Sequence, residues 1–128
     1  MSHEVFLMTE GHKLDCYRKY PEGTERVYAT WTPRSCRNYP EAKEGAVVFG
    51  LQYLIKKYLI EEFEENFFKK PKELVIAGFR HRINSCIGEN NRVDVEHIAA
   101  LHDLGYLPIC IKALPEGVVC PIGVPAIT

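Results

Sequence analysis

The amino-acid sequence predicts an α+β domain in which several packed helices cover a small antiparallel sheet. Three patterns lead to this fold class. Apolar residues recur every three or four positions through the middle of the chain, which is the period of a helix. A segment near the start alternates apolar and polar residues. The end of the chain alternates again on both sides of a turn that contains proline and glycine, which is typical of strands.

The first part of the chain is predicted to form a short helix (10–19), a turn (21–24), a strand (26–31) and a loop (33–45). The turn follows from Pro21 and Gly23, because proline presets its own φ angle and glycine tolerates positive φ. The strand follows from Val27, Ala29 and Trp31, which fall on one face of an extended chain.

The clearest helix is predicted over residues 46–59. Its apolar side chains lie three and four positions apart and therefore form one stripe. They are Val47, Leu51, Leu54, Ile55, Tyr58 and Leu59. The segment 61–70 is compatible with a helix, and its acidic run is expected to be a solvated face paired with Lys69 and Lys70.

Two further helices are predicted after this run. Pro71 suits the first position of one of them, and the other covers residues 94–104, with Asp94 as its N-cap and Gly105 as its end. The side chains predicted to face inward are Leu74, Val75, Phe79 and Ile83 in the first helix and Ile98, Leu101 and Leu104 in the second.

The end of the chain is predicted to form a β-hairpin, with strands at 107–113 and 118–120 and a turn at 115–117. Because a two-stranded ribbon is marginal on its own, the strand near residues 25–32 is the expected neighbour. Cys110 and Cys120 would face each other across this hairpin, as core thiols rather than as a redox pair.

Composition narrows the class of protein. With 128 residues, one domain is expected, and a net charge of −1 gives no reason to expect a nucleic-acid or membrane partner. The five cysteines are scattered without a CxxC pair, which indicates a reducing compartment. No signal peptide and no apolar run of membrane-spanning length occurs, so a soluble cytoplasmic protein is expected.

Common catalytic and metal-binding motifs are absent from the sequence. His97 and His102 lie five positions apart, whereas two ligands on one helix face need a spacing of three or four, so we expect surface or capping histidines and no metal site. There is no Walker A loop, no GxGxxG and no GxSxG. The chain therefore contains no recognisable phosphate cradle of its own.

Basic and aromatic side chains gather between positions 12 and 37. They are His12, Lys13, Tyr17, Arg18, Lys19, Tyr20, Arg26, Arg34 and Arg37. Two interpretations stay open from the residues alone. The cluster binds an anion that carries a ring, because cationic donors pair with phosphate oxygens and tyrosines stack. Alternatively, it is an ordinary basic surface, which is the default for exposed charges.

Three blocks of the sequence resemble the beginning of bacterial and phage nicotinamide phosphoribosyltransferases. The first block is KLDCYRKYPEGTE (13–25) followed by VYATWTPRS (27–35). The second is VFGLQYLIKKYL (48–59), and the third is GYLPI (105–109) followed by IKALPEG (111–117). The blocks occur in order over nearly the whole chain, which is therefore similar to the N-terminal domain of this type II phosphoribosyltransferase family.

The resemblance implies a reaction and an assembly. Members of the family join nicotinamide to the ribose of phosphoribosyl pyrophosphate, with magnesium, and form nicotinamide mononucleotide and pyrophosphate in NAD salvage. They are homodimers with active sites at the subunit interface, and the N-terminal segment of one subunit reaches into the site of the other.

The resemblance also implies roles for individual residues. Arg34 matches the arginine that contacts a substrate phosphate across the dimer, and its planar donors suit that task. His12 stands where a tyrosine usually stacks on the nicotinamide ring. Glu10 and Lys13 belong to the same substrate-binding segment, where Glu10 replaces an aspartate and Cys16 a histidine. No catalytic residue and no metal ligand is expected within this chain.

The barrel that holds ribose, magnesium and pyrophosphate in the family is expected to lie outside residues 1–128, which form a single N-terminal domain. The chain alone is therefore expected to be inactive and to need a second copy or a barrel-containing chain. Two alternatives stay open. The chain is a truncated, non-catalytic remnant that binds or regulates a full-length homologue, or it belongs to an enzyme that uses nicotinate.

Overall fold

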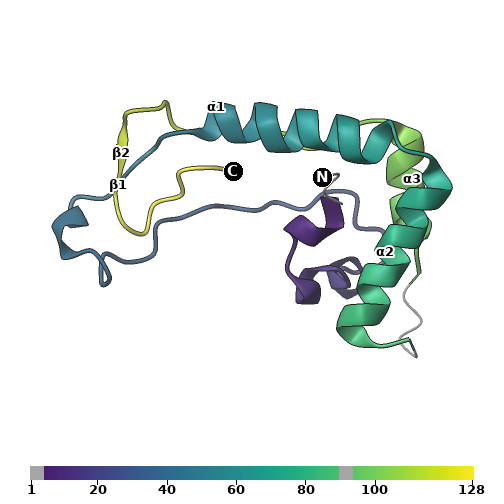
Figure 1. The fold of residues 1–128 in the computed structure, drawn as a ribbon. Coiled ribbons are helices and arrows are strands. Elements are labelled where there is room, and N and C mark those ends of the chain that lie inside the picture. Colours follow the sequence, from purple (N-terminus) through teal and green to yellow (C-terminus); the bar gives the residue numbers. More distant parts are fainter. Residues whose placement is uncertain (1–4, 90–93) are drawn as a thin grey trace. The chain divides into compact units, whose positions relative to one another are not determined.

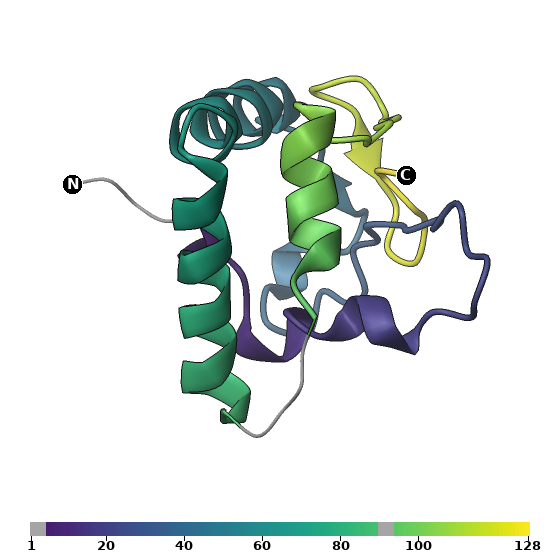
Figure 2. The ribbon, with the colours of Figure 1, turned by 90° about the vertical axis from the view of Figure 1, so that its right-hand side faces the viewer.

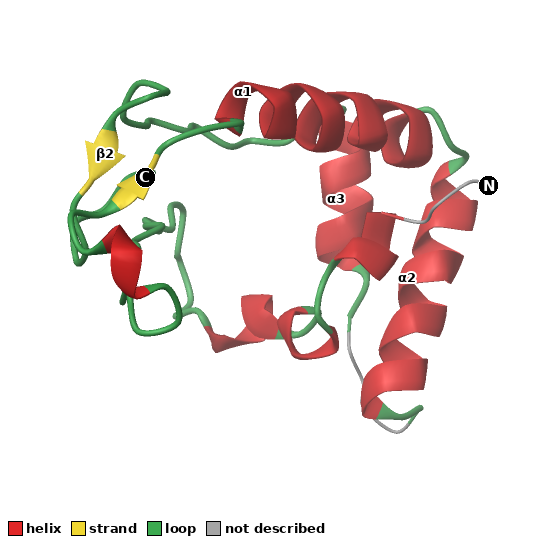
Figure 3. Ribbon diagram, turned by 60° about the vertical axis from the view of Figure 1, so that its left-hand side comes forward, coloured by secondary structure: helices red, strands yellow, loops and turns green. Residues whose placement is uncertain are grey.

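The computed structural model describes residues 5–89 and 94–128, which fall into two compact units (Figure 1). Unit 1 comprises Met1–Thr24 and Lys56–Pro108, and unit 2 comprises Glu25–Ile55 and Ile109–Thr128. Helices packed in unit 1 and a two-stranded antiparallel sheet in unit 2 confirm the predicted α+β class (Figure 3).

Unit 1 is built around helices α2 (Lys72–Ile87) and α3 (Glu96–Leu104), which pack together (Figure 2). Its core contains buried side chains from these helices, from the preceding helical turns and from the N-terminal segment. They are Val5, Leu14, Phe67, Val75, Phe79, Ile83 and Ile98. A salt bridge of 2.5 Å between Lys72 and Asp103 also joins the two helices.

The predicted end of α3 is confirmed, whereas its predicted start at Asp94 is wrong, because the helix begins at Glu96 with Val95 as its N-cap. The carboxylate of Asp94 still accepts a hydrogen bond of 2.8 Å from the backbone N–H of Glu96. Gly105 has a φ of 77°, and its N–H closes the helix onto the carbonyls of Leu101 and His102.

Two predicted core positions are wrong. Leu74 is 59% exposed and Leu104 is 44% exposed. In α2 the buried residues are Val75, Phe79 and Ile83, four positions apart. Since neighbouring helical residues point about 100° apart, Leu74 falls beside this narrow stripe rather than on it.

The predicted helix at 46–59 begins later than expected. Gly50 adopts a left-handed φ of 81°, and α1 starts at Leu51 (Leu51–Leu54). The wider π-type turns Ile55–Glu62 and Glu64–Phe68 continue it. The earlier residues form β1 (Ala46–Val47) instead, because their backbone finds a strand partner in unit 2.

Glu61, Glu64 and Glu65 of the acidic run are exposed and pair with Lys69 in part, as predicted, whereas Glu62 is half-buried and the pairing with Lys70 stays a prediction. Lys69 pairs with Glu65 at 2.6 Å and with Glu64 at 3.6 Å, and Lys57 pairs with Glu61 at 2.7 Å. Exposed pairs of this kind contribute little to stability.

The sheet of unit 2 pairs β1 with β2 (Val119–Cys120), with Ala46 opposite Cys120 and Val47 opposite Val119. Val48, Cys120 and Ala126 form the buried cluster of this unit. The predicted turn before β2 is confirmed, because the N–H of Val118 bonds to the carbonyl of Pro115 at 3.3 Å.

The predicted terminal hairpin is wrong. The strand after the turn, β2, pairs with β1 and not with residues 107–113. Lys112 instead exchanges two backbone hydrogen bonds of 2.8 Å with Thr128, and Ala113 bridges to Ile127. Cys110 is exposed and Cys120 is buried, so they do not form a facing pair. Alternation of apolar residues identifies extended chain but not its partner.

The predicted strand at 26–31 is also wrong, because within the described part of the chain Trp31 alone of these residues forms a bridge, to Ile127. The turn before this segment is as predicted: the N–H of Thr24 bonds to the carbonyl of Pro21, and Gly23 has a φ of 80°. The predicted short helix at 10–19 consists of two 3-10 turns, Gly11–Lys13 and Cys16–Lys19.

Candidate functional site

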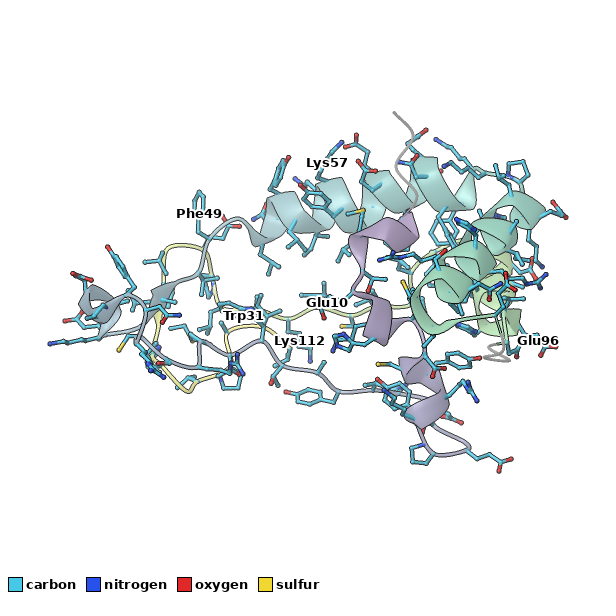
Figure 4. All side chains as sticks on the ribbon, turned by 60° about the horizontal axis from the view of Figure 1, so that its bottom comes forward. Glu10, Trp31, Phe49, Lys57, Glu96 and Lys112 are labelled. Atoms are coloured by element: carbon cyan, nitrogen blue, oxygen red, sulfur yellow. The ribbon has the colours of Figure 1, made fainter. Side chains whose placement is uncertain are left out.

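Three of the predicted site residues lie on the N-terminal segment, by which we mean residues 9–17. Glu10 precedes the 3-10 turn Gly11–Lys13, and His12 and Lys13 lie within it (Figure 4, where Glu10 is labelled). All three side chains are exposed. The ring nitrogen Nε2 of His12 lies 3.4 Å from Oε2 of Glu10, and these side chains are 68% and 72% exposed. A contact this exposed is weak, so both groups remain available to a ligand.

Helix α2 holds the beginning of the N-terminal segment. The guanidinium of Arg82 donates a hydrogen bond of 3.5 Å to the carbonyl of Thr9. Gly11 packs so closely on α2 that a β-carbon there would lie 3.2 Å from Sγ of Cys86. Leu14 is buried in the core of unit 1. The exposed side chains therefore project from a backbone that contacts the rest of unit 1 both before and after them.

Tyr17 attaches the end of the segment to α3. Its ring stacks on His97, with centroids 3.7 Å apart and planes inclined by 24°. Its hydroxyl donates a hydrogen bond of 3.2 Å to the backbone carbonyl of Asp94. Burial and, secondly, the Asp94 carboxylate raise the pKa of Tyr17, which keeps the hydroxyl a donor at neutral pH.

His97 lies between the segment and the core. Its ring and the ring of Phe79 pack edge to face, with centroids 5.3 Å apart and planes inclined by 79°. Burial lowers the pKa of His97, and the nearby Asp94 carboxylate only partly opposes this effect. Its Nδ1 atom is buried and has no hydrogen-bond partner among the described residues. The imidazole therefore acts as a neutral aromatic ring.

The two histidines on α3 are not the surface or capping residues that were predicted. His97 is half-buried in the aromatic stack, and a ring nitrogen of the half-buried His102 lies 2.9 Å from the carbonyl oxygen of Lys70. Within residues 5–89 and 94–128, no group of three or more His, Cys, Asp or Glu side chains is arranged to hold a metal ion.

Arg34, the fourth predicted site residue, belongs to unit 2. It follows Trp31, whose N–H donates to the carbonyl of Ile127 at 2.8 Å and whose carbonyl accepts from Ala126 at 2.9 Å. The carbonyl of Pro33 accepts a further bond of 2.8 Å from Gly123. The Arg34 side chain is exposed, and no carboxylate of the described chain forms an ion pair with it. Its donors are therefore free to meet an anion.

The basic cluster between positions 12 and 37 is divided between the two units. Its cations in unit 1 are Lys13, Arg18 and Lys19, and those in unit 2 are Arg26, Arg34 and Arg37. Arg18 is partly engaged, at 3.4 Å from Asp15.

Sequence reasoning missed the residues that support the N-terminal segment. These are Arg82, Cys86 and His97, which come from helices far along the chain. The only local signal was that Leu14 and Tyr17 lie three positions apart, a spacing that puts both on one side of a helical turn. Nothing in the sequence identifies their partners.

Comparison with known proteins agrees with the three sequence blocks. The family model described as the N-terminal domain of nicotinamide phosphoribosyltransferase matches residues 4–111. A nicotinamide phosphoribosyltransferase of Acinetobacter baylyi is 48% identical over 120 residues, which cover 91% of this chain and 24% of that protein. The chain thus spans about a quarter of the length of this relative. No solved structure matches it. The family match covers most of the chain, and the chain therefore belongs to the nicotinamide phosphoribosyltransferase family, whose N-terminal domain it contains.

Proposed function

We propose that this chain supplies the N-terminal part of a nicotinamide phosphoribosyltransferase, which makes nicotinamide mononucleotide and pyrophosphate from nicotinamide and phosphoribosyl pyrophosphate. The observation that carries the proposal is the N-terminal segment, whose backbone is attached to α2 and α3 while Glu10, His12 and Lys13 remain exposed. A fixed backbone with exposed polar side chains is what a preorganised ligand-binding segment requires.

Each site residue has a task suited to its chemistry. The imidazole of His12 stacks on the pyridine ring of the base, and Lys13 adds positive charge for the phosphates. Glu10 lies beside His12 and is free to accept a hydrogen bond from the substrate. Arg34 donates paired hydrogen bonds to a phosphate of phosphoribosyl pyrophosphate. In the full family enzyme, magnesium would accompany phosphoribosyl pyrophosphate and would offset the negative charge of its phosphates.

The exposed apolar surface of unit 2 supports an assembly with more polypeptide. Phe49 is 84% exposed and Tyr28 is 80% exposed, and Val47 and Tyr53 are also exposed. Apolar side chains exposed in such number favour coverage by another protein surface. We propose that a second subunit and the barrel of the family enzyme provide it. The five free thiols favour the cytoplasm as the site of action. No described helix is long and apolar enough to cross a membrane.

A chimeric enzyme tests the proposal. The 128 residues of this chain replace the matching N-terminal part of the Acinetobacter baylyi relative. Formation of nicotinamide mononucleotide is then measured by chromatography, with the unaltered relative and the relative without this part as controls. We expect activity in the chimera and none in the shortened relative. A folded chimera of native size without product would contradict the proposal, and preferential use of nicotinate would change the assigned base.

A further inference from the structure

The N-terminal segment has little stability of its own. It consists of short 3-10 turns held by single hydrogen bonds, such as that of 2.9 Å from the N–H of Lys13 to the carbonyl of Glu10. Turns of this kind are weak when isolated. The conformation that presents His12 must therefore come from contacts with the rest of unit 1.

These contacts are unequal along the segment. Before and within the first turn, the segment contacts α2 through Arg82 and Cys86. Leu14 then enters the core. After Leu14, the side chain of Tyr17 reaches α3 through its stack on His97, and its hydroxyl bonds to the carbonyl of Asp94. The far end of the segment is thus attached through the ring and the hydroxyl of Tyr17.

That contact continues into the core. The ring of His97 packs edge to face with the ring of Phe79. Phe79 is 2% exposed and belongs to the central stripe of α2. Tyr17, His97 and Phe79 therefore form one continuous series of ring contacts from the segment to the core. His97 is the middle member, and its unpartnered Nδ1 atom shows that hydrogen bonding at this atom does not hold it there.

We propose that His97 and Tyr17 are positioning residues, which hold the N-terminal segment in the geometry that presents His12 to the pyridine base. The inference rests on the proposed function for the task of His12, whereas the attachment itself rests on the ring contacts alone. His97 acts through Tyr17 and touches no substrate.

Hydrogen exchange in the 128-residue chain tests the attachment directly. The reporters are three backbone amides whose acceptor carbonyls lie within the segment, those of Lys13, Leu14 and Arg18. Loss of an aromatic pair predicts exchange about two- to tenfold faster in His97→Ala. His97→Phe keeps a ring at the same place and should exchange as the unaltered chain does. His81→Ala, which changes an exposed histidine of α2, serves as the matched control.

Should His97→Ala fail to fold, Tyr17→Leu removes the same stack from the side of the segment. We expect it to raise exchange of the same amides while the amides of α2 remain protected. Unchanged exchange of the segment in a folded His97→Ala or Tyr17→Leu variant would overturn the proposal.

The chimeric enzyme described above separates positioning from general destabilisation. A positioning role predicts that His97→Ala raises the KM for nicotinamide about two- to tenfold, with the KM for phosphoribosyl pyrophosphate unchanged and recovery in His97→Phe. A merely structural role would lower kcat through loss of folded enzyme and leave both KM values alone, which would overturn the proposal. If the unaltered chimera is inactive, the proposed function fails, and the exchange experiment alone decides the attachment.

Discussion

The backbone of Gly45 packs directly against the carbonyl group of Cys120. A β-carbon at position 45 would overlap that oxygen and would also lie 3.0 Å from the α-carbon of Pro121. Gly45 has a φ of 140°, which side chains rarely adopt. The close approach places Ala46 in register with Cys120 and thereby starts the sheet of unit 2.

Replacing Gly45 with alanine should therefore destabilise unit 2. We expect Gly45→Ala to lower the free energy of unfolding by about 2–4 kcal/mol, because backbone strain and overlap act together. Gly23→Ala is the matched control, since Gly23 also has positive φ but no atom within 4 Å, and it should cost about 1–2 kcal/mol. Fluorescence of Trp31, the single tryptophan, reports denaturation of this unit. Equal losses in the two variants would contradict the packing described.

The buried stripe of α2 leads to a second prediction. Phe79→Ala should destabilise unit 1 by about 3–5 kcal/mol, because a fully buried ring leaves a cavity when it is removed. Leu74→Ala in the same helix should change stability by less than about 0.5 kcal/mol, since Leu74 is exposed. Circular dichroism of the helices during chemical denaturation measures both. A large loss in Leu74→Ala would restore the stripe predicted from the sequence.

The stability of unit 1 should depend on pH through His97. Among the described residues, its ring is faced by Tyr17 on the N-terminal segment, Phe79 on α2 and Asp94 before α3. Burial lowers the pKa of His97 below the ordinary value of 6.5, so the unfolded chain binds the proton more readily than the folded one. The contribution of neutral His97 to the free energy of unfolding is therefore fully present above pH 6.5 and decreases as the pH falls below this value.

Denaturation midpoints measured at a series of pH values test this dependence. His97→Phe should remove the part of the slope just below pH 6.5 while retaining the stack. Tyr17→Phe keeps both rings and the titrating group, so its slope should match that of the unaltered chain. A slope that survives unchanged in His97→Phe would assign the dependence to other groups.

Arg34 should determine the affinity for phosphoribosyl pyrophosphate in the chimeric enzyme. Loss of a hydrogen-bonded charged contact of about 1.5–3 kcal/mol predicts a KM about ten- to a hundredfold higher in Arg34→Ala. Arg34→Lys should recover part of the loss, because lysine keeps the charge without the paired donors. Arg26→Ala, another exposed arginine of unit 2, should have little effect. Similar effects of the two alanine variants would contradict a specific role for Arg34.

The site could be predicted from the sequence only in part. Glu10, His12, Lys13 and Arg34 were identified through blocks of family sequence, and all four have exposed side chains in the structure. Their supports were not identified. The partner of Tyr17 lies eighty positions away at His97, and the periodicity of α3 showed only that this helix had an inward face.

The sequence by itself determined the features that depend on neighbouring residues: the α+β class, the turn after Pro21, the end of α3 at Gly105 and the family. Turn and cap chemistry acts over a few residues, so local composition is enough to specify it. Only the tertiary structure decided that β2 pairs with β1, that the chain near Lys112 pairs with Thr128, and that His97 supports the N-terminal segment. Alternation or periodicity shows which side of an element is apolar, whereas its partner is selected by packing and backbone hydrogen bonds across long stretches of chain.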